Sequence, residues 1–286
     1  MQKAYGLHAS LGDLLVSKFE RDTAVAVVGP GRYRADLDAA WWIALGPNGG
    51  YMAAVLLRAI EASVGDPARA PRSLTVHYVS RPEGGAVEIH TTAERAGRSL
   101  TTVSARMVQG DRLIAVALAA LSRPRHQRVP LALRNARPPD VLPLARAERW
   151  RSAPGSPATV FHEQFDMRWA IPEAPWSGSP TARSAAWVRL AEPQRPDAPL
   201  VAMLADALPP AVFSIAKGFD EVGPVPTIDL TVHFRGPLPA DVGADDFVLA
   251  HFSTRQIGEG FLEEDGEIWT ESGVLLAHSR QLAILG

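Results

Sequence analysis

The sequence predicts an α+β protein in which an antiparallel sheet wraps around one buried helix, and in which this unit occurs twice. Three observations indicate this. An apolar helical segment precedes a run of strand-like segments, the same order of elements returns in the second half, and Leu-Thr-Val-His stands at corresponding places in both halves. A helix packed on one face of a sheet is one of the few layered arrangements that bury both apolar surfaces.

The helix of the first half spans residues 50–64, GYMAAVLLRAIEASV. Arg58 and Glu61 are its only charged residues, and apolar side chains lie on nearly every face, which is typical of a buried helix. Segments rich in β-branched residues follow at 73–80, 86–95, 99–108 and 112–121. Breaks that contain glycine separate them, so they predict a four-stranded antiparallel run after the helix.

The second half repeats this order. Strand-like segments at 161–169 and 184–190 precede a short apolar helix at about 200–208. Further strands are predicted at 227–235, 246–257, 266–272 and 274–285. Leu-Thr-Val-His at 74–77 recurs 156 residues later, and both copies follow the helix and open the strand run, which indicates an internal duplication. A buried helix wrapped by an antiparallel sheet, occurring twice, is the hot-dog arrangement, and two copies can pair edge to edge as a pseudo-dimer.

These elements define the expected domain boundaries. Residues 1–122 form the N-terminal repeat and residues 158–286 the C-terminal repeat. Residues 123–157 are dense in proline and arginine and have no sustained period, so an extended linker is expected there. The alternative is a basic rim beside a phosphate-bearing ligand. Its candidates are Arg123, Arg125, Arg128, Arg134 and Arg137.

Composition excludes several classes of function. The formal net charge is −2, from 29 basic and 31 acidic side chains, so nucleic acid is not an expected partner. The chain has no cysteine, which excludes disulfides, thiolate zinc sites and a cysteine nucleophile. It has no stretch of about 18 consecutive apolar residues, so no membrane span is expected. A cytoplasmic location is the expectation, and the phosphate-loop and zinc-helix motifs are also missing.

Five segments carry a family resemblance. In the first half they are Gly-Pro-Asn-Gly-Gly-Tyr at 46–51, which opens the helix, and LTVHYVSRP at 74–82. In the second half they are LADALPPAVF at 204–213, PTIDLTVHF at 226–234 and VLLAHSRQLAIL at 274–285. With these, most of the chain resembles the TesB-type acyl-CoA thioesterase II family in its double hot-dog form. The resemblance implies an acyl-CoA substrate and no cofactor or metal ion. It also implies that Asp206, Thr227 and Gln281 are catalytic and surround the hydrolytic water.

The chemistry of these three side chains fits thioester hydrolysis, which needs an activated water and a place for the developing oxyanion. Asp206 would act as the base or orient the water, while Thr227 and Gln281 would hydrogen-bond it. Strand alternation puts Gln281 on the face of Ser279 and Ala283. The corresponding segment of the first half, 115–121, is purely apolar, so one working site per chain is expected at the interface of the repeats.

The turn at 46–51 is the candidate substrate-binding element. Backbone N–H groups of Gly49, Gly50 and Tyr51 at a helix start could polarise the thioester carbonyl. The alternative is that the glycines permit a tight turn and close packing. Asn48 would cap the helix or touch the ligand, and capping is the expected role. The paired histidines 77 and 233 are explained by the duplication alone.

Two rival functions remain. A non-catalytic acyl-CoA-binding protein would keep the acyl slot without turnover, and a hot-dog enoyl-CoA hydratase would need an acidic residue with a histidine. No D-x-N-x-x-H segment of the hydratase kind occurs. The outer sheet edges could pair again, so a homo-oligomer is a further expectation.

Overall fold

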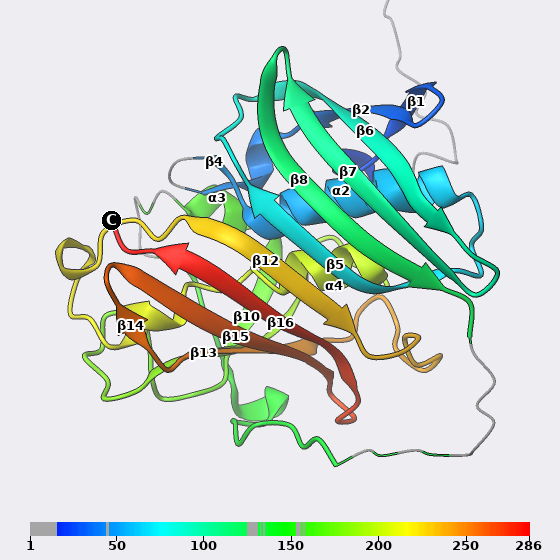
Figure 1. The fold of residues 1–286 in the computed structure, drawn as a ribbon. Helices are drawn as coiled ribbons and strands as arrows, with labels where there is room; N and C mark the ends of the chain where they lie inside the picture. The colour runs from blue at the N-terminus through cyan, green and yellow to red at the C-terminus, as the bar shows by residue number, and fades with distance from the viewer. Residues whose placement is uncertain are drawn as a thin grey trace, which may run out of the picture.

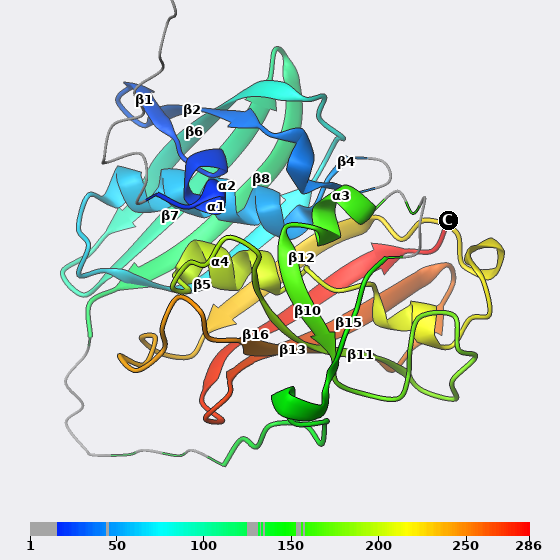
Figure 2. The same ribbon diagram turned by 180° about the vertical axis from the view of Figure 1, so that it is seen from behind.

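A single large antiparallel sheet forms the frame of the protein, with the helices on one of its faces (Figures 1 and 2). The computed structural model describes residues 16–43, 46–124, 131, 133, 135–152, 156 and 158–286. Two central helices, α2 (Gly49–Val64) and α4 (Ala198–Leu204), pack against each other and against the sheet. This arrangement confirms the predicted α+β class and the tandem hot-dog architecture.

The first half supplies one side of the sheet in the order β1-β2-β6-β7-β8-β5. All four strands predicted after the first helix are present, each within about three residues of its expected bounds. The strands are β1 (Ala26–Gly29), β2 (Arg32–Leu37), β5 (Ala70–Tyr78), β6 (Gly85–Ala96), β7 (Leu100–Gln109) and β8 (Arg112–Ser122). A separate small hairpin joins β3 (Trp42–Ile43) to β4 (Gly46–Pro47) just before α2.

The second half continues the sheet in the order β12-β16-β15-β13-β11-β10-β9, which mirrors the first. Its strands are β9 (Glu148–Arg149), β10 (Phe165–Trp169), β11 (Ala182–Leu190), β12 (Thr227–Phe234), β13 (Val248–Thr254), β15 (Phe261–Thr270) and β16 (Leu275–Ile284), with β14 (Ile257–Gly258) paired to β15. Because the orders mirror each other, each of the six strands of the first repeat has a counterpart in the second, which adds β9 and β14.

The two halves meet where β5 pairs with β12. The register joins Leu74 to Val232 and Val76 to Leu230, so the two Leu-Thr-Val-His copies face each other in opposite directions. Thr75 pairs with its own counterpart Thr231, and their Oγ1 atoms are 3.0 Å apart. The pseudo-two-fold axis therefore passes through this threonine pair, which supports the duplication inferred from the sequence.

Capping residues fix where the two central helices begin. The Asn48 side chain accepts from the Tyr51 N–H at 3.0 Å, and Asp197 accepts from the Leu200 N–H at 2.8 Å. Helix α2 ends at Val64 and is capped by Gly65, whose φ of 62° is in the left-handed region. The predicted buried character of α2 is confirmed, because ten of its sixteen residues are buried.

Several predicted bounds were wrong. The second helix was expected to reach residue 208, but α4 ends at Leu204. Asp206 lies in a tighter turn after the helix, where its N–H donates to the Met203 carbonyl. Pro209 and Pro210 prevent further helix because proline has no N–H. The segment at 161–169 begins as a short helix, α3 (Thr159–His162), and the strand predicted at 266–272 begins earlier, at Phe261.

A short helix, α1 (Lys18–Asp22), was not predicted. A capping box between Ser17 and Glu20 starts it. Single 3-10 turns complete the described elements: η1 (Ala39–Trp41), η2 (Leu144–Arg146), η3 (Ala211–Ser214) and η4 (Phe219–Glu221).

Part of the proline- and arginine-rich connection packs on the second half. The Leu142 N–H donates to the Ala170 carbonyl at 2.7 Å, and the Trp187 indole donates to the Leu142 carbonyl at 2.8 Å. Of the candidate basic rim, Arg123 pairs with Asp66 at 2.8 Å and Arg137 is exposed. Arg125, Arg128 and Arg134 lie outside the described residues.

Among the described residues, no helix combines the length and the apolar character that crossing a membrane would require.

Candidate active site

Asp206 is held by the start of helix α2, which belongs to the other repeat. The Asn48 amide donates to the Asp206 backbone carbonyl at 2.8 Å and to its Oδ2 at 3.0 Å. The Gly50 N–H donates to the same Oδ2 at 3.0 Å. A helix N-terminus favours negative charge, so the first repeat supplies the electrostatic support for a carboxylate of the second.

The glycines of the turn allow this close approach. A Cβ on Gly50 would lie 2.4 Å from the Met203 carbonyl oxygen, and a Cβ on Gly49 would lie 2.9 Å from Asp206 Oδ2. These distances support the packing interpretation of the two glycines. The Gly50 N–H and the Tyr51 N–H donate within the protein, to Asp206 and to Asn48 respectively.

Tyr51 lies in the core rather than on an open surface. Its side chain is fully buried, its ring stacks on Trp41 with centroids 5.6 Å apart, and its hydroxyl donates to the Asp22 carbonyl at 2.7 Å. The Asn48 amide, as expected, caps the helix and also reaches Asp206. The expected contacts of these residues with substrate remain a prediction.

Thr227 and Gln281 come together on the inner face of the sheet. Thr227 begins β12, and its hydroxyl donates to Gln281 Oε1 at 3.0 Å. Gln281 is 6% exposed and shares the inner face of β16 with Ser279 and Ala283, as strand alternation predicted. The Gln281 amide also acts to lower the pKa of the Asp206 carboxyl group, so the three predicted catalytic residues lie in one neighbourhood.

A fourth polar side chain, Glu264 of β15, completes this network. It is 3% exposed and pairs directly with Gln281 across the strands. Its Oε1 accepts from Gln281 Nε2 at 2.7 Å, and its Oε2 accepts from the Ala211 N–H at 2.5 Å. The network therefore runs from Thr227 through Gln281 to Glu264.

Sequence reasoning missed Glu264 because the acidic run at 263–265 looks like a loop. A signal was nevertheless present, since alternation along β15 places Glu264 on the inner face with Leu262 and Ile268. Its neighbour Glu263 points to the other face and accepts from the Arg255 and Gln256 N–H groups.

Burial changes the acidity of both carboxyl groups. Loss of water around Asp206 raises its pKa to about 6, against the opposing effect of donors from Gly50, Gln281 and Asn48. Burial likewise raises the pKa of Glu264 to about 7, opposed by the Ala211 N–H and Gln281 and increased by the charge of Asp206. Two carboxyl groups that titrate near neutrality in one site are typical of acid–base chemistry.

Tyr78, at the end of β5, also lies against the turn. Its hydroxyl donates to the Gly49 carbonyl at 2.7 Å. Burial and the nearby charges of Asp206 and Asp229 raise its pKa well above the ordinary value, so it stays protonated and acts as a donor. This residue, also missed from the sequence, fixes the turn from the sheet side.

Among the described residues of the first repeat, apolar side chains occupy the positions equivalent to this polar network. Strand register gives the counterparts: Ala119 for Gln281, Pro71 for Thr227 and Val103 for Glu264. None of these three side chains can form a hydrogen bond. The two halves of the pseudo-dimer are therefore chemically unequal at this place.

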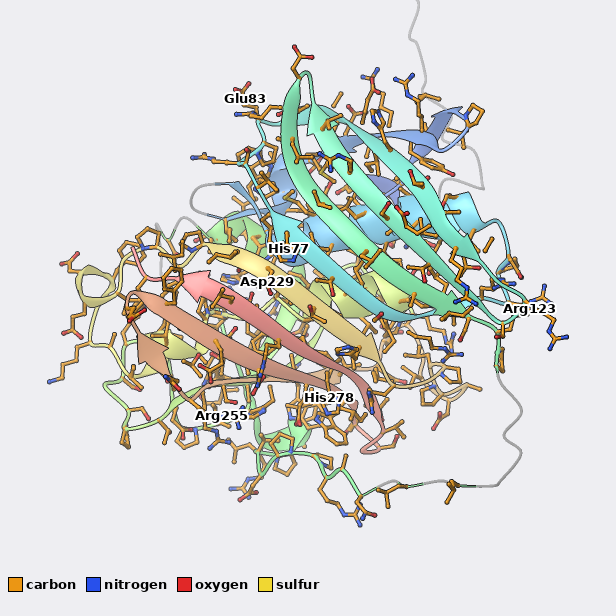
Figure 3. The ribbon with its side chains drawn as sticks, in the orientation of Figure 1. His77, Glu83, Arg123, Asp229, Arg255 and His278 are labelled. Atoms are coloured by element: carbon orange, nitrogen blue, oxygen red, sulfur yellow. The ribbon has the colours of Figure 1, made fainter. Side chains whose placement is uncertain are left out.

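The paired histidines lie on the opposite face of the sheet. His77 and His233 are exposed, alternating with buried residues of β5 and β12. His77 pairs with Asp229 on the outer face, away from the helices (Figure 3). Neither histidine belongs to the network around Asp206.

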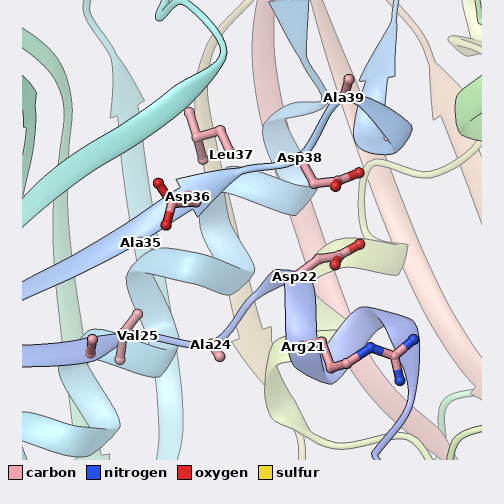
Figure 4. A pocket seen from close by; sticks show the side chains of 10 residues that line it. Arg21, Asp22, Ala24, Val25, Ala35, Asp36, Leu37, Asp38 and Ala39 are labelled. Atoms are coloured by element: carbon pink, nitrogen blue, oxygen red, sulfur yellow. The ribbon is translucent and has the colours of Figure 1, made fainter. Parts of the chain in front are cut away.

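A hollow of about 540 Å³ lies elsewhere, between α1 and β2 (Figure 4). Its wall combines small apolar side chains with the carboxylates of Asp22, Asp36 and Asp38. The residues that line it do not include Asp206, Thr227, Gln281 or Glu264.

Comparison with known proteins gives two family matches. The family model for the acyl-CoA thioesterase N-terminal domain matches residues 38–122, and that for the acyl-CoA thioesterase C-terminal domain matches residues 138–285. The uncharacterized protein Rv0499 of Mycobacterium tuberculosis is 25% identical over 281 residues, covering 88% of this chain and 90% of that protein.

Solved structures agree on the fold. A conserved protein of unknown function with a hot-dog fold from Alicyclobacillus acidocaldarius has a TM-score of 0.83 and 25% identity, covering 95% of this chain and 99% of that one. The acyl-CoA thioesterase II TesB2 of Mycobacterium marinum has a TM-score of 0.71 and 19% identity, covering 94% and 98%.

Proposed function

The chain belongs to the acyl-CoA thioesterase family, as its resemblance to thioesterase II predicted, and we propose that it hydrolyses fatty acyl-CoA to the free acid and CoA. The observation that carries this proposal is the meeting of Asp206, Thr227 and Gln281 beside the start of α2. These residues are far apart in sequence, and two of them have apolar counterparts in the first repeat.

Asp206 serves as the general base. With a pKa of about 6 its carboxylate is mostly ionised at pH 7, yet it is basic enough to accept a proton from water. The water oxygen then bonds to the thioester carbonyl carbon while Asp206 takes the proton. Collapse of the tetrahedral intermediate breaks the carbon–sulfur bond, and the thiolate leaves with the electron pair. The thiolate then takes the proton held by Asp206, which returns to its ionised form.

Thr227 and Gln281 position this water. Their hydrogen bond leaves the hydroxyl oxygen able to accept and the amide able to donate a second time. Two fixed partners hold the water near its line of attack, which lowers the entropic part of the barrier.

A non-catalytic acyl-CoA-binding protein is the second candidate. Binding alone gives no reason to bury a carboxyl group whose pKa is raised to about 6, whereas a general base needs such a group. Enoyl-CoA hydration is disfavoured further. His77 and His233 lie on the outer face of the sheet, so neither can work with Asp206 as an acid–base pair.

The test is release of free thiol from a panel of acyl-CoAs of increasing chain length by the purified protein. Asp206→Asn should abolish release, while Asp229→Asn, on the outer face, should retain it. Acyl-CoA binding without thiol release would support the non-catalytic candidate. Loss of enoyl-CoA absorbance without thiol would point to a hydratase.

A further inference from the structure

We propose that Glu264 is a positioning residue of this site: it fixes which end of the Gln281 amide faces Asp206 and the reacting water. The proposal rests on the proposed function and deepens it. It does not make Glu264 a catalytic residue, because no contact of Glu264 with substrate is involved.

The argument begins with the two ends of the Gln281 amide. An amide can rotate by 180° with little change in shape, so its neighbours decide which end is the oxygen. Above its pKa of about 7 Glu264 is ionised and acceptor-only, so the NH₂ end then faces its Oε1, at 2.7 Å. The oxygen end then faces Thr227 and accepts its hydroxyl at 3.0 Å.

Thr227 alone cannot impose this orientation. A hydroxyl both donates and accepts, so it would hydrogen-bond either end of the amide. Of the two side chains that hydrogen-bond the Gln281 amide, Glu264 is the one that can do so in only one orientation of the amide. With that orientation fixed, the second N–H of Gln281 is left for the reacting water beside Asp206.

Glu264 also joins the two segments that carry the site. Its second oxygen accepts from the Ala211 N–H, in the loop that leaves Asp206 and enters η3. The same carboxylate therefore links the loop of Asp206 to the strand of Gln281. The Ala211 N–H is part of the backbone and cannot reorient, so it keeps its hydrogen bond to Oε2 of Glu264. This leaves Oε1 to accept from Gln281.

Because each oxygen of Glu264 accepts from a different donor, glutamine cannot replace this residue. Glu264→Gln has one oxygen and one NH₂ group, so only one of the two donors keeps its acceptor. The Gln281 amide can flip to offer its oxygen to the new NH₂ group, whereas the Ala211 N–H cannot. The variant is therefore expected to fold with the Gln281 amide reversed and its N–H withdrawn from the reacting water.

Glu263→Gln is the matched control. Glu263 is the adjacent residue of the same strand and also accepts two backbone N–H groups, at 2.9 and 3.0 Å, but it faces the other side of the sheet. Both variants lose one charge and one acceptor oxygen, and they differ in whether the loss reaches Gln281.

The experiment measures thiol release from acyl-CoA together with the side-chain amide resonances of Gln281 in ¹H–¹⁵N spectra. The Gln281 signals are identified as those missing from Gln281→Leu. Glu264→Gln should lower kcat on the order of 10- to 100-fold, the size found when a group that orients a functional side chain is removed. KM should change little, the Gln281 signals should move, and Glu263→Gln should match the native protein in all three respects.

Equal kcat in the Glu264→Gln and Glu263→Gln variants would overturn the proposal, as would a lower kcat with unmoved Gln281 signals. Glu264→Asp keeps both acceptor oxygens on a shorter side chain. This variant should keep the native Gln281 signals and a higher kcat than Glu264→Gln. If Glu264→Gln does not fold, Glu264→Asp is the test, and shifted Gln281 signals in a variant with native kcat would overturn the proposal. If the native protein releases no thiol, the proposed function fails, while the resonances still report whether Glu264 sets the amide.

Discussion

Replacing Asp206 with asparagine should remove activity and, at alkaline pH, stabilise the fold. The rise of the Asp206 pKa from 3.8 to about 6 means that ionising this group in the folded protein costs about 3 kcal/mol more than in the unfolded chain. Asparagine has a similar shape and no charge. It loses an acceptor oxygen worth about 1 kcal/mol, so the net gain at pH 8 should be about 1–2 kcal/mol.

The sign of the pH dependence follows from the direction of this shift. The folded protein holds the Asp206 proton more tightly than the unfolded chain, so stability from this group is lost as pH rises from about 4 to about 6 and is level above. At pH 5 the cost of ionisation is about half its full value, and the advantage of asparagine should nearly vanish.

Thermal unfolding at pH 5 and pH 8 measures this difference. The Asp206→Asn variant should melt about 2–6 °C above the native protein at pH 8 and close to it at pH 5. Asp229→Asn, on the outer face, is the control and should show no such pH-dependent gain. An Asp206→Asn variant that melts below the native protein by the same margin at both pH values would refute the reasoning.

Three further outcomes are expected. The kcat/KM for acyl-CoA should fall about tenfold for each pH unit below about 6, because protonated Asp206 cannot accept a proton from water; a flat profile to pH 5 would contradict this role. Thr227→Val should lower kcat by about 10²-fold or more while Tm changes little, and activity within twofold of native would exclude a role in positioning water. Gly50→Ala should lower the free energy of unfolding in urea by about 1–3 kcal/mol, because the added Cβ would meet the Met203 carbonyl oxygen. Gly236→Ala, with open space around it, is the control, and equal urea midpoints for the two variants would contradict the packing argument.

Much of the fold was predictable because its signals are local. The apolar helix at 50–64 and the four strands after it carry their own periodicity and turn residues. The Leu-Thr-Val-His repeat added long-range information, since it marked the two strands that pair at the pseudo-two-fold axis. The bounds of α4 were less predictable, because the chain leaves the helix through a tighter turn before Pro209.

The candidate site was only partly predictable for a different reason. Asp206, Thr227 and Gln281 were found through family resemblance, and the burial of Gln281 followed from alternation along its strand. Glu264 and Tyr78 were missed, because their roles come from partners at Ala211 and Gly49 that no local pattern identifies. Contacts between repeats depend on the tertiary arrangement.

The threonine pair at the axis has a consequence for how this protein can evolve. In a dimer of identical subunits, each substitution at the seam appears on both sides of the axis. Here Thr75 and Thr231 are encoded separately, as are Gln281 and its apolar counterpart Ala119. A substitution in one repeat therefore leaves the other unchanged, and the two repeats can hold different parts of one site. Here the second repeat carries the polar network, and the first contributes the helix start that binds Asp206.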